Sequence, residues 1–234
     1  MSRPNPAEIL EAAMASGDDG CMRIKHLGHS CVLIESAGKR ILLDPGAFSD
    51  AWHDLDAVDA VFVTHQHADH ADPKNLPSFL GRHLEALIAV EASVPEHVEL
   101  PDDARRLEAG ETIWVGDVQV RTVGGWHAVI HDDIARVHNV GLLVSEPDGP
   151  TLFHPGDALE TAPTDVDFVC IPLQAPWSAT KEVIDFTRAV GAPRGMLIHD
   201  GLLNDQGYQT VSQHIVNLGG STIEDLRDGR WLEI

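Results

Sequence analysis

The stretch that decides the fold is Val58-Asp-Ala-Val-Phe-Val-Thr-His-Gln-His-Ala-Asp-His70. Its apolar run at 61–63 is typical of a buried strand and ends in four side chains that can bind metal ions. These four are His65, His67, Asp69 and His70. Side chains at i and i+2 of an extended segment share a face, so the first two can bind one cation together, and a bend would turn the other two toward a second cation. Imidazole combined with carboxylate favours zinc, iron or manganese over calcium or magnesium.

Four further apolar segments also end in a histidine or an aspartate. Segment 40–43 precedes Asp44, segment 117–126 precedes His127, segment 150–156 precedes Asp157, and segment 194–198 precedes His199. Glycine or proline stands near most of these ends, where the chain would turn. Each residue alone also fits a strand cap or a turn. Their joint occurrence, in this order, is a feature on which the family resemblance given below rests.

Composition and charge limit the classes of partner. No uninterrupted apolar run approaches the length of about 18 residues that a membrane span needs. The formal net charge is −21, with only 16 Lys and Arg residues, whereas nucleic-acid binding relies on neutralising phosphates with such residues. We therefore expect a small-molecule substrate, no nucleic acid and no membrane span.

The cysteines and the N-terminus indicate the compartment. Cys31 and Cys170 lie in apolar runs and are expected to be buried thiols. The N-terminus has neither a basic leader nor an apolar signal core. We expect a cytoplasmic protein. The oligomeric state stays open, and a homo-oligomer fits the sequence.

The order of elements predicts a layered α/β domain. Residues 1–21 read as an N-terminal extension and 22–234 as a single domain. Strands are expected first, and strands alternate with helices in the second half, notably a helix over 179–190 and another over 208–218. Expected strands cover 22–27, 30–36, 39–44, 58–64, 87–90, 112–115, 117–124, 137–145, 150–154, 166–173 and 194–199, with a closing strand at the C-terminus.

The pattern H-x-H-x-D-H resembles the signature of the metallo-β-lactamase superfamily. The phrases Met22-Arg-Ile-Lys-His-Leu-Gly-His-Ser and His154-Pro-Gly-Asp157 resemble the branch that contains ascorbate-6-phosphate lactonase and many uncharacterised metal-dependent hydrolases. This resemblance implies the αββα four-layer sandwich of that superfamily, with metals at one edge of two packed sheets. The chain departs from the family pattern at Gln174, Pro176-Trp177 and Asp200, near the implied pocket.

The resemblance also implies a binuclear metal centre. The first cation would be held by His65, His67 and His127, the second by Asp69, His70 and His199, and Asp157 would bridge the two. Zn²⁺ is expected first, with Mn²⁺ or Fe²⁺ as alternatives. Asp44 would orient ligands. His29 and His154, by their place in the sequence, are candidates for the same role, and a plain hydrogen-bonded structural role fits each of them equally well. A hydroxide bridging the metals would be the nucleophile, with Asp69 orienting it and accepting a proton.

Several other side chains are candidates for substrate contact. The tryptophans fall in loops beside the ligand-bearing strand ends, and surface packing explains them equally well. The histidines flank the loop after His127, where a solvated position is the favoured explanation. The candidates are Trp52, Trp126, His131, His138 and Trp177.

Three functional classes follow from the implied centre. The first is a two-metal hydrolase of a small ester, lactone, amide or phosphodiester. The second is an iron-dependent oxidoreductase of the same fold, although related diiron reductases usually carry a carboxylate where His67 stands. The third is a metal-binding module without catalysis, which a complete ligand set disfavours.

Overall fold

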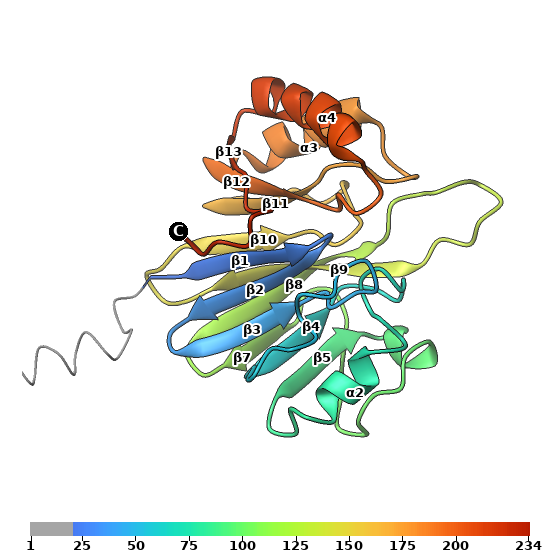
Figure 1. Cartoon of the computed structure of the whole chain (residues 1–234), viewed down its shortest axis with the longest axis vertical. Coiled ribbons are helices and arrows are strands. Elements are labelled where there is room, and N and C mark those ends of the chain that lie inside the picture. Colours follow the sequence, from blue (N-terminus) through green and yellow to red (C-terminus); the bar gives the residue numbers. More distant parts are fainter. Residues whose placement is uncertain (1–20) are drawn as a thin grey trace, which may run out of the picture.

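The first sheet is built from the apolar segments of the N-terminal half (Figure 1). The computed structural model describes residues 21–234. The strands are β1 (Arg23–Gly28), β2 (Cys31–Ser36), β3 (Lys39–Leu43), β4 (Ala60–Val63), β5 (Leu87–Glu91), β6 (Arg105–Leu107) and β14 (Leu232–Glu233). Their order is β14-β1-β2-β3-β4-β5-β6. The pairs from β14 to β3 are antiparallel, and the pairs from β3 to β6 are parallel.

The second sheet repeats this arrangement with later strands. They are β7 (Thr112–Val115), β8 (Val118–Trp126), β9 (His138–Ser145), β10 (Thr151–His154), β11 (Phe168–Pro172), β12 (Arg194–Ile198) and β13 (Thr222–Glu224). The order is β13-β12-β11-β10-β9-β8-β7. Pairing is antiparallel from β7 to β10 and parallel from β10 to β13.

Three apolar clusters hold the layers together. Residues such as Ile34 and Phe62 of the first sheet pack with Leu142 and Phe168 of the second, which places one core between the sheets. Helix α2 (Leu76–Leu80) packs on the outer face of the first sheet, and α3 (Thr180–Val190) and α4 (Asp205–Leu218) pack on that of the second. A short 3₁₀ turn, Val94–Glu96, follows β5. The predicted αββα sandwich is confirmed.

The observed elements lie within a few residues of the predicted ones. Four short elements, α2, β6, β13 and the 3₁₀ turn Val94–Glu96, were not predicted, because runs of three to five residues carry little periodicity. Cys31 and Cys170 are free and buried, as expected. Residues 1–20 of the predicted N-terminal extension lie outside the described part of the chain. Between residues 21 and 234, no helix combines the length and the apolar character that crossing a membrane requires.

The direction of the strands gathers the predicted site at one edge of the sandwich. Strands β3 and β4 run parallel in one sheet, and β10, β11 and β12 run parallel in the other, so their carboxyl ends point the same way. Two backbone hydrogen bonds join the sheets at this edge. Val140 N–H donates to the carbonyl of Thr64 at 2.9 Å, and His199 N–H donates to that of His29 at 2.8 Å.

Gly46 lets two of these loops touch. The loop after β3 lies against the loop after β4, with Ala47 N–H donating to the carbonyl of Ala68 at 2.8 Å. A Cβ atom at position 46 would overlap the backbone of Asp69 and His70. Only glycine therefore allows this approach.

Gly46→Ala should destabilise the fold, because one of the two loops must move away. Overpacking of this kind costs about 1–3 kcal/mol or more in free energy of unfolding. Gly81→Ala is the matched control, since Gly81 has helical φ and a Cβ there would make only ordinary contacts. Thermal or urea unfolding of both variants measures the difference, and equal stability would contradict the close approach described above.

Candidate metal centre

The loop after β4 places the quoted histidines at the edge of the first sheet. His65 and His67 point at the same spot, with Nε2 of the former 3.1 Å from Nδ1 of the latter. His127, from the end of β8, and Asp157, from the loop after β10, approach the same point. His65, His67, His127 and Asp157 can each offer one ligand atom, and these atoms all lie within 4.8 Å of one another. We call these residues the first group.

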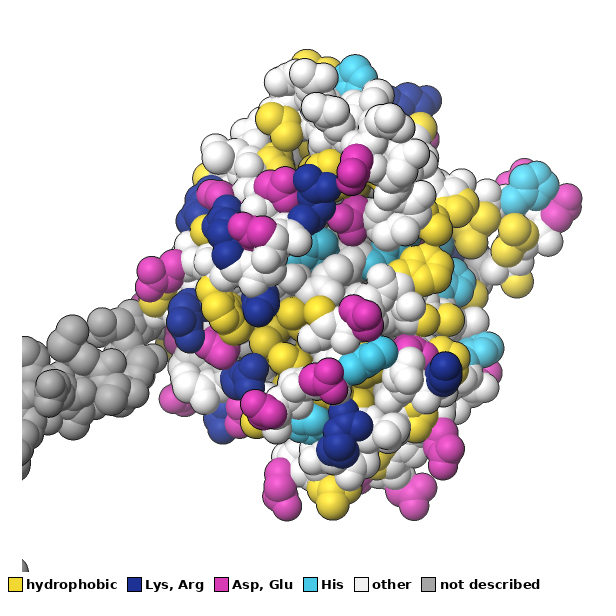
Figure 2. Space-filling view, viewed as in Figure 1, with side chains coloured by type: hydrophobic (Ala, Val, Ile, Leu, Met, Phe, Trp, Pro, Cys, Tyr) yellow, Lys and Arg dark blue, Asp and Glu magenta, His cyan; other side chains and the backbone are white. Residues whose placement is uncertain are grey.

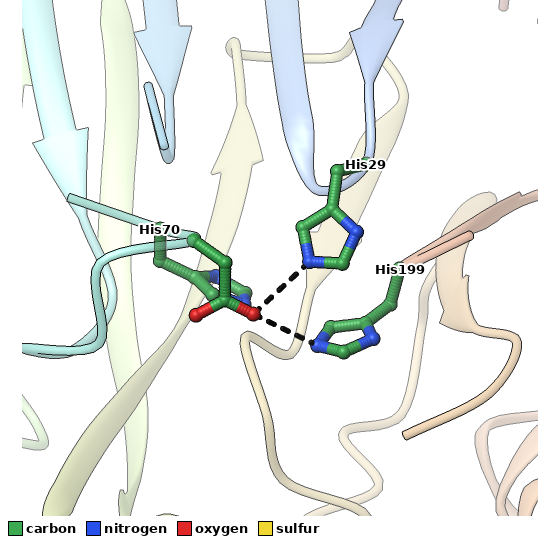
Figure 3. Close-up of side chains that lie close together, drawn as sticks. His29, His70 and His199 are labelled. Carbon is green, nitrogen blue, oxygen red and sulfur yellow. Dashed lines mark hydrogen bonds and ion pairs between the residues drawn. The ribbon is translucent and has the colours of Figure 1, made fainter. Parts of the chain in front are cut away.

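A second group lies beside it. His70 and Asp69 come from the β4 loop, and His199 follows β12. His199 Nε2 lies 3.6 Å from Asp69 Oδ2. His29, in the turn between β1 and β2, completes the second group of His29, Asp69, His70 and His199, again within 4.8 Å. Figure 3 shows His29 and His199 pointing toward the carboxylate that lies between them.

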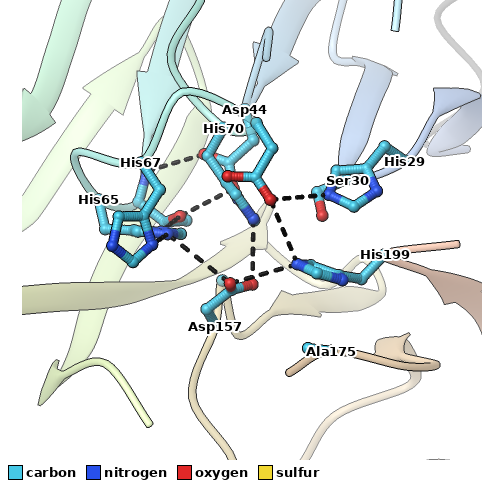
Figure 4. A network of polar contacts seen from close by, with 12 residues as sticks. His29, Ser30, Asp44, His65, His67, His70, Asp157, Ala175 and His199 are labelled. Atoms are coloured by element: carbon cyan, nitrogen blue, oxygen red, sulfur yellow. Dashed lines mark hydrogen bonds and ion pairs between the residues drawn. The ribbon is translucent and has the colours of Figure 1, made fainter. Parts of the chain in front are cut away.

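Asp157 contacts histidines of both groups. Its Oδ1 lies 3.0 Å from His70 Nε2, and its Oδ2 lies 3.3 Å from Nε2 of both His127 and His199. Figure 4 shows the Asp157 carboxylate facing His65, His70 and His199 across the site. Its position between the groups is the one that a bridging ligand would need.

Hydrogen bonds at Nδ1 leave the Nε2 atoms of the outer histidines free for a metal. His127 Nδ1–H donates to the carbonyl of Ala128 at 2.6 Å. His199 Nδ1–H donates to the carbonyl of Gln174 at 2.8 Å. Each bond fixes the tautomer whose Nε2 lone pair points into the site.

Asp44 orients one histidine in each group. His70 Nδ1–H donates to Asp44 Oδ2 at 2.6 Å. The Thr64 hydroxyl donates to the same oxygen at 2.8 Å, so its lone pair is left to accept from His65 Nδ1–H at 3.0 Å. One buried carboxylate thus holds His70 directly and His65 through Thr64.

The donor atoms and their charges fit a pair of divalent cations. His70 Nε2 and Asp157 Oδ1 are buried and face each other at 3.0 Å, and His199 Nε2 is buried against the carboxylates of Asp69 and Asp157 at 3.6 and 3.3 Å. Such atoms are costly unless a partner is bound. The carboxylates of Asp44, Asp69 and Asp157 are buried or half-buried and also need positive charge nearby. Imidazole with carboxylate is the donor set of zinc, iron and manganese.

Burial and the neighbouring charged groups shift the pKa values of the site histidines. Burial, and then the neighbouring His70, lower the pKa of His65 well below its usual range, so it is a neutral imidazole with a lone pair to offer. Burial also opposes charge on His199, but the carboxylates of Asp157 and Asp69 raise its pKa to about 9. Bound cations would replace the proton that His199 then carries.

Two of the predicted orienting histidines use both ring nitrogens. His29 Nδ1 accepts from Gly201 N–H at 3.1 Å, so the proton lies on Nε2, which donates to Asp69 Oδ2 at 3.1 Å. His29 therefore holds Asp69 instead of offering a lone pair. His154 Nδ1 accepts from Gly156 N–H, and its Nε2–H donates to the carbonyl of Ser30. That bond ties β10 to the first sheet.

The residues predicted to contact the substrate do not lie together. Trp52 is 0% exposed and packs against Phe79, with its indole N–H donating to the carbonyl of Gly46, so it is a core residue and not a wall of this site. Trp126 and His138 stack at 4.1 Å and line a separate cavity of about 540 Å³ with Glu91.

The remaining two candidates, His131 and Trp177, lie in different environments. His131 is 65% exposed on the loop that projects from the body between β8 and β9. Trp177 is at the site itself, where its indole N–H donates to Asp157 Oδ2 at 3.0 Å. Trp177 is thus the predicted aromatic residue that the structure brings to the metal centre.

Sequence reasoning found Asp44 and His29 but missed other groups that support the predicted ligands. Thr64 precedes His65 directly and could have been found from its hydroxyl. Asn139 gave no signal, because it lies in β9 and accepts from Asp157 N–H only after the sheets pack. The carbonyls of Ala128 and Gln174 belong to the backbone and carry no residue signature.

Three site residues adopt left-handed backbone conformations. The φ angles are 52° for His29, 46° for Asp44 and 58° for His199. Such angles are uncommon for residues other than glycine and collect at functional sites. Each of these residues ends a strand or turn, so the unusual angle directs its side chain into the site.

Comparisons with known proteins place the chain in a family. A family model described as the beta-lactamase superfamily domain matches residues 23–195. Protein Rv0786c of Mycobacterium tuberculosis is 36% identical over 183 residues, which cover 78% of this chain and 85% of that protein. A UPF0173 metal-dependent hydrolase of Nitratidesulfovibrio vulgaris is 29% identical over 148 residues, which cover 58% of each chain.

Solved structures share the fold. Igni18, a metallo hydrolase from Ignicoccus hospitalis, superposes with a TM-score of 0.68 at 15% identity and covers 92% of this chain and 98% of its own. CmlA, a diiron beta-hydroxylase from Streptomyces venezuelae, superposes with a TM-score of 0.67 at 17% identity over 91% of this chain and 54% of its own. At these identities the likeness extends to the architecture alone.

Asp44→Asn should weaken metal binding at both groups, because an amide presents N–H groups where His70 and Thr64 need an acceptor. Losing such an orienting partner typically costs roughly 10–100-fold in metal affinity. Competition with a coloured chelator measures the affinity, and circular dichroism checks the fold. Thr64→Val keeps Asp44 but cuts its link to His65, so one equivalent should be released more easily than the other. The exposed Asp117→Asn is the control, and unchanged affinity in Asp44→Asn would remove its orienting role.

Proposed function

The chain belongs to the family of beta-lactamase superfamily domains, and from that premise we propose that it is a metal-dependent hydrolase with two divalent cations, zinc being the first expectation. His65, His67 and His127 would hold one cation. Asp69, His70 and His199 would hold the other, with Asp157 shared. When bound, the cations would supply a hydroxide at neutral pH and a Lewis acid for negative charge that develops in the reaction.

The observation that carries the proposal is the shared carboxylate. Among residues 21–234, Asp157 is the carboxylate that lies within 4 Å of histidine nitrogens of both groups, and its Oδ1 faces His70 Nε2 at 3.0 Å. Burial would raise the pKa of Asp157, but His70 and His199 lower it well below its usual range. A carboxylate that stays ionised between two sets of imidazoles supports a binuclear centre.

Asp69 is the carboxylate that can reach both the second group and water. Its side chain is 20% exposed, whereas Asp157 is 3% exposed. Burial opposes its ionisation, but hydrogen bonds from His199 and His29 lower the pKa of Asp69 strongly. Asp69 therefore accepts a hydrogen bond from the nucleophile and orients it, and holds a proton only briefly.

His29 acts through Asp69. Its Nε2–H occupies Asp69 Oδ2, and the bond from Gly201 N–H fixes the ring in the tautomer that donates. The other oxygen of Asp69 is left to face the nucleophile. His29 is a positioning residue in this proposal.

The substrate is a small ester, lactone, amide or phosphodiester. A carbonyl carbon or a phosphorus atom can be attacked by the same nucleophile, so the metal centre alone does not choose among them. The strong negative charge of the chain, −21, weighs against long polyanions.

Metal analysis tests the centre. Protein purified from metal-replete medium should contain about two equivalents of transition metal, and chelation should lower its melting temperature because a ligand of the native state stabilises that state. Asp157→Ala should lose at least one equivalent. His214→Ala, at an exposed position on α4, should keep both. Protein that binds no transition metal would overturn the proposal at its foundation.

Asp69→Ala should lower turnover of a small ester, lactone or phosphodiester by roughly 10²–10⁴-fold, the range for a group that acts directly on the proton of a nucleophile. The measurement is kcat over a substrate panel, with metal content measured beside it, so that loss of the cation is separated from loss of orientation. Asp117→Ala should behave as the parent protein. Turnover that survives both chelation and Asp69→Ala would place catalysis elsewhere. Oxygen consumption by the iron-loaded protein, without hydrolysis across the panel, would favour oxidation instead.

A further inference from the structure

An apolar groove begins beside the candidate metal centre. It has a volume of about 510 Å³, within the rough 300–1,000 Å³ range of small-molecule sites. Trp177 joins the two, because its indole N–H donates to Asp157 Oδ2 while its ring lines the groove. The ring centroid of Trp177 lies 5.7 Å from that of His127 and 5.9 Å from that of His199. A molecule bound at the metals would therefore meet this groove next.

The walls of the groove are hydrocarbon. They come from the start of the projecting loop, from the segment after Asp157 and from one side of α3. The wall residues are Ala128, Val129, Leu159, Phe186 and Ala189. Val129 is 49% exposed at this wall, so its side chain can be reached from the solvent. The loop is held in place at its start, where Ala128 N–H donates to the carbonyl of Asp157 at 2.7 Å.

The rim of the groove is acidic. Glu160, Glu182 and Asp185 line it. Arg136 is a cation near the rim, and it pairs with Glu160 at 2.8 Å. The groove itself therefore favours an uncharged group and repels an anionic one. Figure 2 shows the projecting loop carrying apolar and acidic side chains together.

We propose that this groove binds an uncharged hydrocarbon arm of the substrate, such as the acyl or alkyl chain of an ester, amide or lactone. The inference rests on the proposed hydrolytic function and narrows its substrate class. Trp177 holds the point where the arm meets the reacting group. Phosphodiesters and acids with a charged end are poor substrates, because the acidic rim opposes their entry.

A chain-length series tests the groove. In p-nitrophenyl esters from acetate to octanoate, kcat/KM should rise by on the order of two- to fourfold per methylene until the groove is filled. Ala189→Trp and Val129→Asp, which block or charge the wall at exposed positions, should lower the octanoate-to-acetate ratio of kcat/KM by at least tenfold. Gln213→Trp, on the exposed face of α4, should keep the ratio. A flat series, or a bis(p-nitrophenyl) phosphate that outperforms every ester, would overturn the proposal while leaving hydrolysis intact.

Binding measured without turnover separates this inference from the proposed function. Calorimetric titration of the purified protein with 1-octanol and 1-butanol should show tighter binding of the longer alcohol, and Ala189→Trp should abolish the difference. If the alcohols bind in this way but no ester is hydrolysed, the proposed function fails and the groove stands. If esters are hydrolysed but octanol binds no better than butanol, the groove assignment fails and the function stands.

The rim has its own test. The side chain of Asp185, on α3, makes no hydrogen bond or ion pair within the described chain, so its charge can be reversed without breaking a side-chain contact. Asp185→Lys should raise kcat/KM for the mono-p-nitrophenyl ester of a dicarboxylic acid at least threefold relative to the neutral ester of equal length. An unchanged ratio would show that the rim does not select by charge.

Discussion

The buried carboxylate of Asp44 is the interaction on which the candidate metal centre depends. A fully buried charge is costly unless donors surround it, and here Thr64 supplies both its N–H and its hydroxyl while His70 supplies Nδ1–H. This one carboxylate orients His70 of the second group directly and His65 of the first group through Thr64. The first and second groups therefore cannot shift independently. Asp44 therefore fixes the relative positions of two of the proposed ligands, His65 and His70, without being a ligand itself.

The two sheets make this arrangement rigid. Thr64 follows β4 of the first sheet, and its carbonyl accepts from Val140 of the second. On the other side of the site, the carbonyl of His29 accepts from His199 N–H. Each sheet supplies ligands to the same centre, so separating the layers would pull the proposed ligand set apart. The packing of the apolar core between the sheets therefore also fixes the geometry of the site.

Much of the fold could be predicted from sequence because the strands are apolar runs that end abruptly. The histidines and aspartates at those ends were identified by position, and parallel strands then bring them to one edge. Contacts made only after packing left no such trace. Asn139 supports Asp157 from another strand, and Trp52 was misplaced because a tryptophan in a loop looks alike whether it lines a pocket or fills a core. Local pattern predicts which residues end a strand, and tertiary contacts decide what those residues face.

The charges around the site favour binding of the transition state over binding of the substrate. Asp44, Asp69 and Asp157 bring three negative charges, which together with one hydroxide would balance the charge of two divalent cations. The groove beside them is apolar inside and acidic at its rim. An anion would be repelled at the rim before it reached the cations, whereas a neutral ester or amide would pass. On such a substrate, negative charge would develop only in the transition state, at the metal centre, where the cations would stabilise it. The site would therefore bind the transition state more strongly than the substrate.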